Sequence, residues 1–451
     1  MKNRRGSTKL NNAIIVFTRV PEAGKTKTRM MPYYTEEQCK ALHEAFLKDI
    51  GEMLALTSHD VIVSYTGKAP DSLSQVFGAD AKYIEQTGDN LGDRMRNAIA
   101  WALDYGYDKV VLFGTDVPEL RAESIDAAFS LLDSNDVVLG PTEDGGYYLI
   151  GMKALCEEAF DVKKYGTDGV LSETMKSITE SGKQVRLIDS YYDLDEPSDI
   201  QEYRERMRED ERLQVSNTGK FISGTSKISI IVPIYNESKT IESMMSQLSP
   251  YQNDAEIIFV DGGSTDDSVE KIGNQFKLIK TEKGKGHQMN EGAKASTGDI
   301  LFFLHCDSEI PPRIVEEIRT CMTSNQYGCF GIGFRSRNFF MHTNKVISNH
   351  RAFRRGIPFG DQGIFIDRKL FFDMGMFPEL PLMEDYEFAL KLKSRGIMPG
   401  KAKETIHTSC RRYGNGTKDI LKAEYKAWIL RHRYRKGVNI CELSDEYGDI
   451  R

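Results

Sequence analysis

The sequence predicts an α/β protein of two domains, each built on a mostly parallel, doubly wound sheet. The chain has 451 residues, more than one hydrophobic core usually organises. In both halves, short apolar segments alternate with amphipathic ones, as parallel strands joined by helices require. A polar, glycine-containing segment separates the halves. We therefore expect domains at residues 1–213 and 228–451, joined by a linker at 214–227.

The expected elements of the first half follow the chain in alternating order. Short apolar runs, several of them rich in β-branched residues, predict strands, and longer segments with apolar residues at helical spacing predict helices. We expect strands at residues 13–17, 61–65 and 109–113, and helices at 36–56 and 199–212. The last helix is highly charged and closes the first domain.

The second half repeats this alternation. We expect strands at residues 228–232, 256–260 and 300–304, and helices at 240–248 and 267–276. Each half also contains a strand that ends in a short acidic motif followed by proline, with Asp116 before Pro118 and Asp307 before Pro311. The shared plan predicts two copies of one fold class.

Composition and charge exclude several classes of protein. A net charge of −7 and a pI near 5.8 argue against a general nucleic-acid binder. No apolar run is long enough for a signal peptide core or for a membrane span. The seven cysteines are scattered, without a Cys-x-x-Cys pair. We expect a cytoplasmic protein with no transmembrane segment and no nucleic-acid partner; the sequence leaves its oligomeric state open.

Polar residues directly follow three expected strands of the second half. Ligands of open α/β sheets bind at the carboxyl ends of strands. The first of these strands leads into a loop, and Asp261 stands at the tip of the second. Its carboxylate suits a nucleobase or ribose, although Asp261 as the cap of the next turn is an equal alternative. Candidate nucleotide-binding residues here are Pro233, Tyr235, Glu237 and Asp261.

The third of these strands ends in His305 and Asp307, which are two residues apart. Alternate residues of a strand point to the same side, so both side chains can face one site. An imidazole and a carboxylate suit Mn²⁺ or Mg²⁺ bridging a diphosphate. A buried histidine satisfied by hydrogen bonds is the commoner alternative for His305 alone.

These motifs, in this order, resemble those of the family-two glycosyltransferases over residues 227–451. The resemblance implies a GT-A fold, a nucleotide-sugar donor and a metal at Asp307, with His305 standing where the family usually has an aspartate. It further implies that residues 360–363 contact donor sugar and acceptor. The Glu384–Asp385 motif would supply the general base, Asp385, for an inverting displacement. Acids favoured at a helix N-terminus are the structural alternative.

Two further features of the second half bear on the substrate. The resemblance places Arg411 or Arg412 on the diphosphate, where a guanidinium suits phosphate oxygens. His407, nearby in the sequence, could reach a metal, although a surface histidine is the expected role. The tail at residues 421–436 is rich in Lys, Arg and His. A solvated face is its expected role, and contact with anionic lipid or a partner is the alternative. Polysaccharide synthases of this family usually carry membrane-spanning helices after this region. Because none follows here, a small soluble acceptor is expected.

The first half contains a basic loop after its first strand. The loop lies where phosphates bind in α/β sheets, and its spacing is not that of a Walker motif. Basic loops also occur by chance. Its candidate phosphate-binding residues are Arg19, Gly24, Lys25, Lys27 and Arg29.

Motifs at residues 88–94, 114–118, 140–148 and 193–199 complete the first half. Together they resemble a family of GT-A-fold transferases often encoded beside radical-SAM enzymes and linked to arsenosugar biosynthesis, and the second half resembles another family from these gene neighbourhoods. The first half is also similar to nucleotidyltransferases. That similarity implies a metal at Asp116 and either Asp193 or Asp195. A helix cap is the alternative for residues 195–199.

Three hypotheses follow for the whole chain. Both halves transfer sugars in succession, which makes the protein bifunctional. Alternatively, the first half is a nucleotidyltransferase that makes the nucleotide-sugar used by the second. In the third hypothesis, one half is a non-catalytic binding module.

Overall fold

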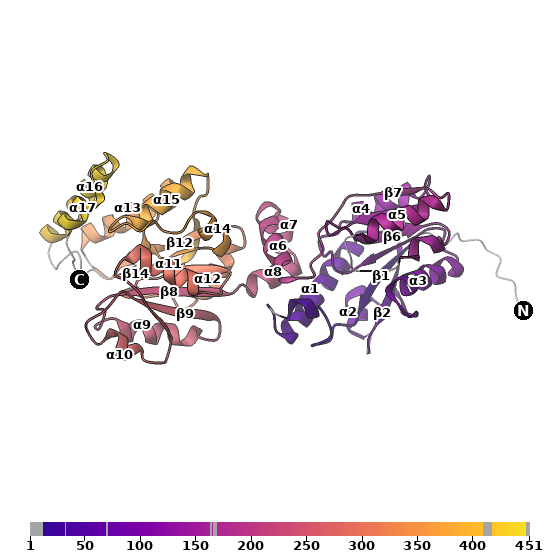
Figure 1. Ribbon diagram of the computed structural model, residues 1–451, viewed down its shortest axis with the longest axis horizontal. Coiled ribbons are helices and arrows are strands. Elements are labelled where there is room, and N and C mark those ends of the chain that lie inside the picture. The colour runs from indigo at the N-terminus through magenta and orange to yellow at the C-terminus, as the bar shows by residue number, and fades with distance from the viewer. Residues whose placement is uncertain are drawn as a thin grey trace, which may run out of the picture. The chain divides into compact units, whose positions relative to one another are not determined.

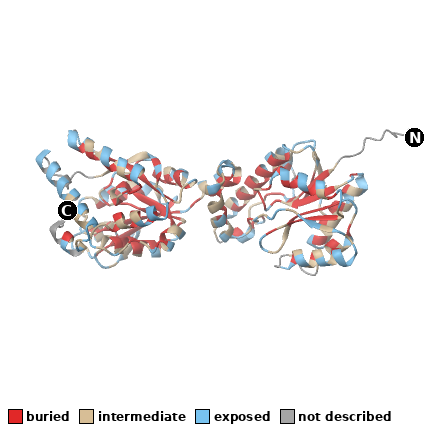
Figure 2. Cartoon of the chain, turned by 90° about the horizontal axis from the view of Figure 1, so that it is seen from above, coloured by how far each residue is buried: buried red, intermediate tan, exposed pale blue. Residues whose placement is uncertain are grey.

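The computed structural model describes residues 12–31, 33–68, 71–162, 165, 169–336, 338–408 and 417–447. Two compact units, Met1–Ile222 and Ser223–Arg451, are described separately below (Figure 1). In each unit the strands are largely buried and exposed residues lie on the outer faces of the helices (Figure 2). None of the helices in these described ranges is both long and apolar enough to cross a membrane.

Unit 1 is built on a seven-stranded sheet in the order β3-β2-β1-β4-β6-β5-β7. All neighbouring strands are parallel except β6, which is antiparallel to both β4 and β5. The strands are β1 (Ala13–Arg19), β2 (Asp60–Thr66), β3 (Lys82–Glu85), β4 (Val110–Gly114), β5 (Val137–Pro141), β6 (Tyr147–Met152) and β7 (Val185–Leu187).

Helices cover both faces of the unit 1 sheet, because alternate residues of its central strands are apolar on both sides. Ala13 and Ile15 pack with α3 and α5, whereas Ile14 and Val16 pack with α1 and α4. The helices are α1 (Glu36–Leu54), α2 (Asp71–Phe77), α3 (Leu91–Tyr105), α4 (Ala122–Leu131), α5 (Val170–Glu180), α6 (Pro197–Glu209), α7 (Glu211–Val215) and α8 (Asn217–Gly224).

The segment expected to be a linker, residues 214–227, is largely helical and packs on unit 1. The Asp49 carboxylate in α1 accepts the N–H groups of Asn217 (2.7 Å) and Thr218 (2.9 Å) at the start of α8. Leu213 and Ile222 are buried in a cluster with residues of α1 and α6. The sequence pattern did not show this, because the partner carboxylate lies far away in the chain.

Unit 2 repeats the strand order of unit 1, as β10-β9-β8-β11-β13-β12-β14, with β13 antiparallel to both neighbours. Alternate residues of β8 again face opposite layers. Ile230 and Val232 pack with α9 (Ile241–Leu248) and α12 (Ile314–Met322), and Ile231 packs with α11 (Lys285–Ala295), α14 (Arg368–Asp373) and α15 (Glu384–Ser394). The strands are β8 (Ile228–Ile234), β9 (Ala255–Asp261), β10 (Lys277–Lys280), β11 (Ile300–Phe303), β12 (Tyr327–Phe334), β13 (Ile364–Asp367) and β14 (Gly400–Thr408).

The helices of unit 2 cover both faces of its sheet and extend to the end of the described chain. They are α9 (Ile241–Leu248), α10 (Ser268–Ile272), α11 (Lys285–Ala295), α12 (Ile314–Met322), α13 (Phe339–Arg355), α14 (Arg368–Asp373), α15 (Glu384–Ser394), α16 (Thr417–Arg435) and α17 (Ile440–Tyr447). Helix α10 is shorter than the expected 267–276, because Gly273 leaves the helical conformation with a φ of 53°.

Candidate active sites at the carboxyl edges of the two sheets

The loops after β8 and β9 lie side by side, because these strands are parallel neighbours with Ile234 opposite Asp261. Asn236 joins the two loops. Its backbone N–H donates to Ser264 Oγ (2.9 Å), and its side-chain Oδ1 accepts the Thr265 N–H (2.8 Å). Its φ of 53° is a left-handed conformation that asparagine tolerates. One pair of linked loops therefore carries the candidate nucleotide-binding residues Pro233, Tyr235, Glu237 and Asp261.

Three of these candidates make defined contacts. Asp261 is buried and its Oδ1 accepts the Ser264 N–H (3.0 Å), which is the turn-capping role left open by the sequence. A carboxylate has about four acceptor sites, so this bond leaves capacity for a nucleoside. The Lys283 ammonium lies 4.3 Å from the centroid of the Tyr235 ring. Glu237 Oε2 accepts the Thr240 hydroxyl (2.6 Å).

His305 and Asp307 lie in a turn beyond β11, which ends at Phe303. The expectation that strand alternation turns both side chains to one side therefore does not describe them. The turn is held by the Ser308 N–H, which donates to the His305 carbonyl (3.1 Å). Beyond it, Glu309 and His407 exchange backbone hydrogen bonds of 2.7 and 3.0 Å. Asp307 is thus half-buried between His305 and Glu309, whose backbones are held by these hydrogen bonds. The pairing with Glu309 also brings His407 to the same turn.

Gly360 brings His305 and Asp385 together. The Gly360 N–H donates to Asp385 Oδ2 (2.6 Å). A Cβ atom on Gly360 would lie 2.7 Å from His305 Nε2 and 3.4 Å from Asp385 Oδ2. The Tyr386 N–H donates to the other carboxylate oxygen, Asp385 Oδ1 (2.7 Å). Two candidate residues that are far apart in the sequence thus both lie beside Gly360, and two N–H groups orient the Asp385 carboxylate.

Glu384 is buried beside Asp385 at the start of α15, and it forms an ion pair with the first residue of α11. Its carboxylate lies 3.7 Å from the Lys285 ammonium. Burial raises the pKa of Glu384, the nearby Asp385 charge raises it further, and Lys285 opposes both. The helices approach closely because Gly286 has no side chain: a Cβ there would lie 3.3 Å from Glu384 Cβ. Glu384 thus anchors the helix start that presents Asp385.

The donor atoms of unit 2 fit a divalent cation only in part. Within the described residues, no three His, Cys, Asp or Glu side chains are grouped to hold a metal ion by themselves. Asp307 and His305 supply a carboxylate and an imidazole, so further ligands would have to come from a substrate diphosphate, as is common for Mg²⁺. Arg411 and Arg412, the candidates for that diphosphate, lie outside the described residues.

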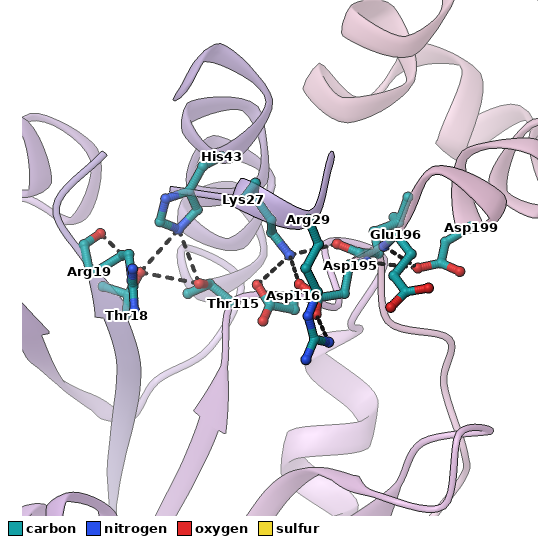
Figure 3. A network of polar contacts seen from close by, with 11 residues as sticks. Thr18, Arg19, Lys27, Arg29, His43, Thr115, Asp116, Asp195, Glu196 and Asp199 are labelled. Carbon is teal, nitrogen blue, oxygen red and sulfur yellow. Dashed lines mark hydrogen bonds and ion pairs between the residues drawn. The ribbon is translucent and has the colours of Figure 1, made fainter. Parts of the chain in front are cut away.

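In unit 1, Lys27 links the basic loop to Asp116, just after β4, and to Asp195, just before α6 (Figure 3). Its ammonium lies 2.7 Å from Asp116 Oδ1 and 3.5 Å from Asp195 Oδ1, and it donates to the Leu194 carbonyl (2.5 Å). Its side chain is only 4% exposed. The Lys27 ammonium holds the pKa of Asp116 below its ordinary value. Asp116 and Asp195, the predicted metal ligands, hold an ammonium group between them and do not fit a metal ion in this arrangement.

The other predicted cations of this loop also pair with acids or backbone. Arg29 Nη1 lies 2.7 Å from Asp195 Oδ2, and Lys25 Nζ lies 2.6 Å from Glu22 Oε2. Arg19 donates to the Lys25 carbonyl (2.7 Å). Gly24 has a φ of 75°, which suits glycine at this bend. The loop is thus preformed at the carboxyl edge, and its charges are partly balanced by acids.

Two further titratable side chains lie near this loop. The sequence does not mark His43, and it leaves Asp193 as one of two alternative metal ligands. His43 in α1 bonds to the hydroxyls of Thr18 and Thr115 at 3.3 Å each, and burial lowers its pKa to about 3, so it is neutral at physiological pH. No motif marks it, because its partners lie on distant strands. Asp193 has a pKa raised to about 6 by burial and then by nearby carboxylates, of which Asp144 is the strongest.

In comparison with known proteins, the two units match different families. Residues 229–377 match the family described as Glycosyl transferase family 2. Residues 49–167 match the family described as an uncharacterized protein conserved in bacteria (DUF2064). A protein of Desulfovibrio desulfuricans G20, provisionally described as a nucleotide-diphospho-sugar transferase, is 29% identical; the match covers 47% of this chain and 93% of that one, with a TM-score of 0.44.

Most of the relatives match this chain over only part of their own length. An uncharacterized glycosyltransferase of Haemophilus influenzae is 27% identical over 217 residues, covering 44% of this chain and 74% of that protein. An uncharacterized glycosyltransferase of Nostoc sp. is 34% identical over 107 residues, covering 21% of this chain and 33% of that protein. The chain thus spans about a third of the length of the Nostoc relative.

The predicted fold class is confirmed. Both units are α/β domains with one strand order, and unit 2 contains the family match, so the chain has two tandem domains of the nucleotide-diphospho-sugar transferase (GT-A) type. The predicted glycosyltransferase domain is confirmed as well: residues 229–377 form a glycosyl transferase family 2 domain.

Proposed function

We propose that unit 2 transfers a sugar from a nucleotide-diphosphate donor to a hydroxyl group of a small soluble acceptor, with inversion at the anomeric carbon. The family match supports sugar transfer. The observation that carries the proposal is the meeting of His305 and Asp385 at Gly360. Asp307 lies two residues beyond His305, so a base and a candidate diphosphate site stand close to one another.

In this proposal, Asp385 acts as the general base. Its two oxygens accept the Gly360 and Tyr386 N–H groups, which hold the carboxylate in place while it keeps acceptor capacity for a substrate hydroxyl. The hydroxyl proton passes to Asp385 as the hydroxyl oxygen bonds to the anomeric carbon. The bond from that carbon to the diphosphate breaks on the opposite face. A single displacement of this kind inverts the anomeric centre.

The leaving group needs positive charge nearby. Asp307, with His305, would hold a divalent cation such as Mg²⁺ or Mn²⁺, whose charge stabilises the departing diphosphate. Arg412 would assist there, by its family resemblance. The nucleoside would lie on the linked loops after β8 and β9, with Asp261 accepting hydrogen bonds from it and Tyr235 supplying an aromatic face.

For unit 1, we propose a second transferase domain that binds a phosphorylated donor through Lys25, Lys27 and Arg29. The shared strand order and the preformed basic loop support this reading. A nucleotidyltransferase that makes the donor for unit 2, or a non-catalytic binding module, are the alternatives. Release of pyrophosphate from a nucleoside triphosphate and a sugar phosphate, lost in Asp116→Ala, would identify the nucleotidyltransferase. A role in arsenosugar-type biosynthesis is supported by motif resemblance.

Asp385→Asn should abolish sugar transfer while nucleotide binding survives, because an amide cannot take the acceptor proton and the β8 and β9 loops are unchanged. We expect transfer to fall by at least about a hundredfold, in the range typical of a lost general base. Transfer is measured with a panel of nucleotide sugars, and UDP and GDP affinity by calorimetry. Asp373→Asn, at an exposed carboxylate that ends α14, is the matched control. Transfer at the parental rate would remove Asp385 from this role.

Asp307→Ala should weaken the binding of UDP or GDP only when Mn²⁺ or Mg²⁺ is present, because its carboxylate acts through the cation. Affinity is compared with added metal and with a chelator. Asp254→Ala, at an exposed carboxylate before β9, should match the parent under both conditions. An equal loss of affinity with and without metal would show instead that Asp307 supports the fold or contacts the nucleotide directly.

Asp193→Asn should stabilise unit 1 at neutral pH. The pKa of Asp193 is about 6 in the folded protein and its ordinary value is 3.8. The folded state therefore binds the proton more tightly, and stability falls as pH rises from about 4 to 6. The melting temperature of the variant should exceed that of the parent at pH 8, and the gain should vanish at about pH 4. Asp189→Asn, at an exposed residue, should show no such profile. A gain that does not depend on pH would contradict the burial of a charged Asp193.

A further inference from the structure

Two helices of unit 2, α13 and α16, expose an unusual amount of apolar surface. Fifteen large apolar side chains are exposed in the described part of the chain, and seven of them lie on these two helices. Such clustering marks an interaction surface more often than scattered exposure does. The seven residues, which we call the α13/α16 surface, are Phe339, Phe340, Val346, Ile347, Leu421, Tyr425 and Trp428.

The apolar residues of α13 form a stripe opposite its buried face. Helical geometry places residues 339, 346 and 347 within one side of the helix. Phe339 is 74% exposed, and Val346 and Ile347 are more than half exposed. The opposite side, with Met341 and Ala352, is buried in unit 2. Helix α13 therefore has two apolar faces, one buried in the core of unit 2 and one exposed.

Helix α16 carries a stripe of the same kind. Leu421, Tyr425, Trp428 and His432 follow one another at intervals of three or four residues, so they share one side of the helix. The Tyr425 and Trp428 rings stack at 6.2 Å between centroids, and the Trp428 and His432 rings at 5.4 Å. Trp428 remains 55% exposed. The aromatic side chains are thus ordered along the surface and still open on one side.

Helices α13 and α16 are in contact with each other. At their starts, Asn338 Nδ2 donates to Thr417 Oγ1 (3.1 Å). Near their ends, the Arg431 guanidinium of α16 lies 5.7 Å from the ring of Phe359, just after α13. The two stripes therefore lie on two neighbouring helices. Helix α13 also leads into the loop that carries Gly360.

The charge of this helix pair is opposite to that of the chain. Helix α13 contains four lysines and arginines and no acid, and α16 contains six lysines and arginines and two acids, although the chain carries a net charge of −7. Exposed Lys418 and Lys422 flank Leu421, and exposed Arg354 ends the α13 stripe. Aromatic and aliphatic residues flanked by Lys and Arg are typical of helices that lie on an anionic bilayer.

We propose that the α13/α16 surface docks unit 2 on a lipid bilayer that contains anionic phospholipid. A second copy of the chain fits less well, because a two-fold contact would bring the same basic patches together. A protein partner fits less well too, because lysine is depleted from the centres of protein interfaces and here it flanks the apolar stripe. The proposal is independent of sugar transfer, since none of these seven residues belongs to the candidate active site.

The two tryptophans of the chain, Trp101 and Trp428, allow a direct test. Trp101 is in unit 1 and is also partly exposed, at 36%. In Trp101→Phe, the emission of Trp428 should shift to the blue and be quenched by vesicles of brominated phosphatidylcholine mixed with phosphatidylglycerol. In Trp428→Phe, the emission of Trp101 should not respond. Quenching of both tryptophans, or of Trp101 alone, would overturn the proposal.

Vesicle sedimentation tests the chemistry of the surface. The full chain should bind phosphatidylglycerol-containing vesicles, bind pure phosphatidylcholine poorly, and dissociate at high salt. Phe339→Ser with Trp428→Ser should reduce binding by about tenfold or more, as removal of two inserted aromatic side chains implies. Trp101→Ser is the matched control, and circular dichroism with the melting temperature reports whether the variants fold. Equal binding to both lipids, or no binding together with self-association that the double variant abolishes, would contradict lipid docking.

Discussion

The candidate site of unit 2 depends on a close approach that only glycine permits. At Gly360, the imidazole of His305 comes so near that a single Cβ atom would lie 2.7 Å from Nε2. The same residue donates its N–H to Asp385, which fixes the carboxylate. Helix α15 can present that carboxylate because Gly286 and Glu384 hold its start against α11. The chemistry of the site therefore rests on backbone geometry as much as on the acids themselves.

The two units use one scaffold in different ways. Asp116 and Asp307 follow strands β4 and β11, which hold the same position in the two sheets. In unit 1, the buried Lys27 ammonium lies against Asp116, and acids partly balance the charge of the basic loop. In unit 2, the turn after the strand places the His305 imidazole beside Gly360, whose N–H donates to the Asp385 carboxylate of α15. A shared fold thus does not imply a shared reaction, and each activity has to be argued from its own side chains.

Much of the fold was predictable, because buried strands such as residues 228–234 are nearly continuous apolar runs. What the sequence did not show depends on contacts between distant residues. Asp49 accepts the N–H groups at the start of α8 within the expected linker, and β6 and β13 run antiparallel without any local signal. At the sites, the strand-end acids were predictable from their position after apolar runs. The meeting of His305, Gly360 and Asp385, and the neutral His43 between two threonines, required the tertiary structure.

The most direct test of the central claim is the rate of sugar transfer by Gly360→Ala, compared with its affinity for UDP or GDP. Gly360 has no left-handed φ, so alanine adds a methyl group without backbone strain. The account predicts a rate lower by on the order of a hundredfold, as expected when a base is displaced, with nucleotide affinity in the absence of a divalent cation unchanged. Gly224→Ala, where nothing lies within 4 Å, should match the parent. Undiminished transfer by Gly360→Ala would contradict the account.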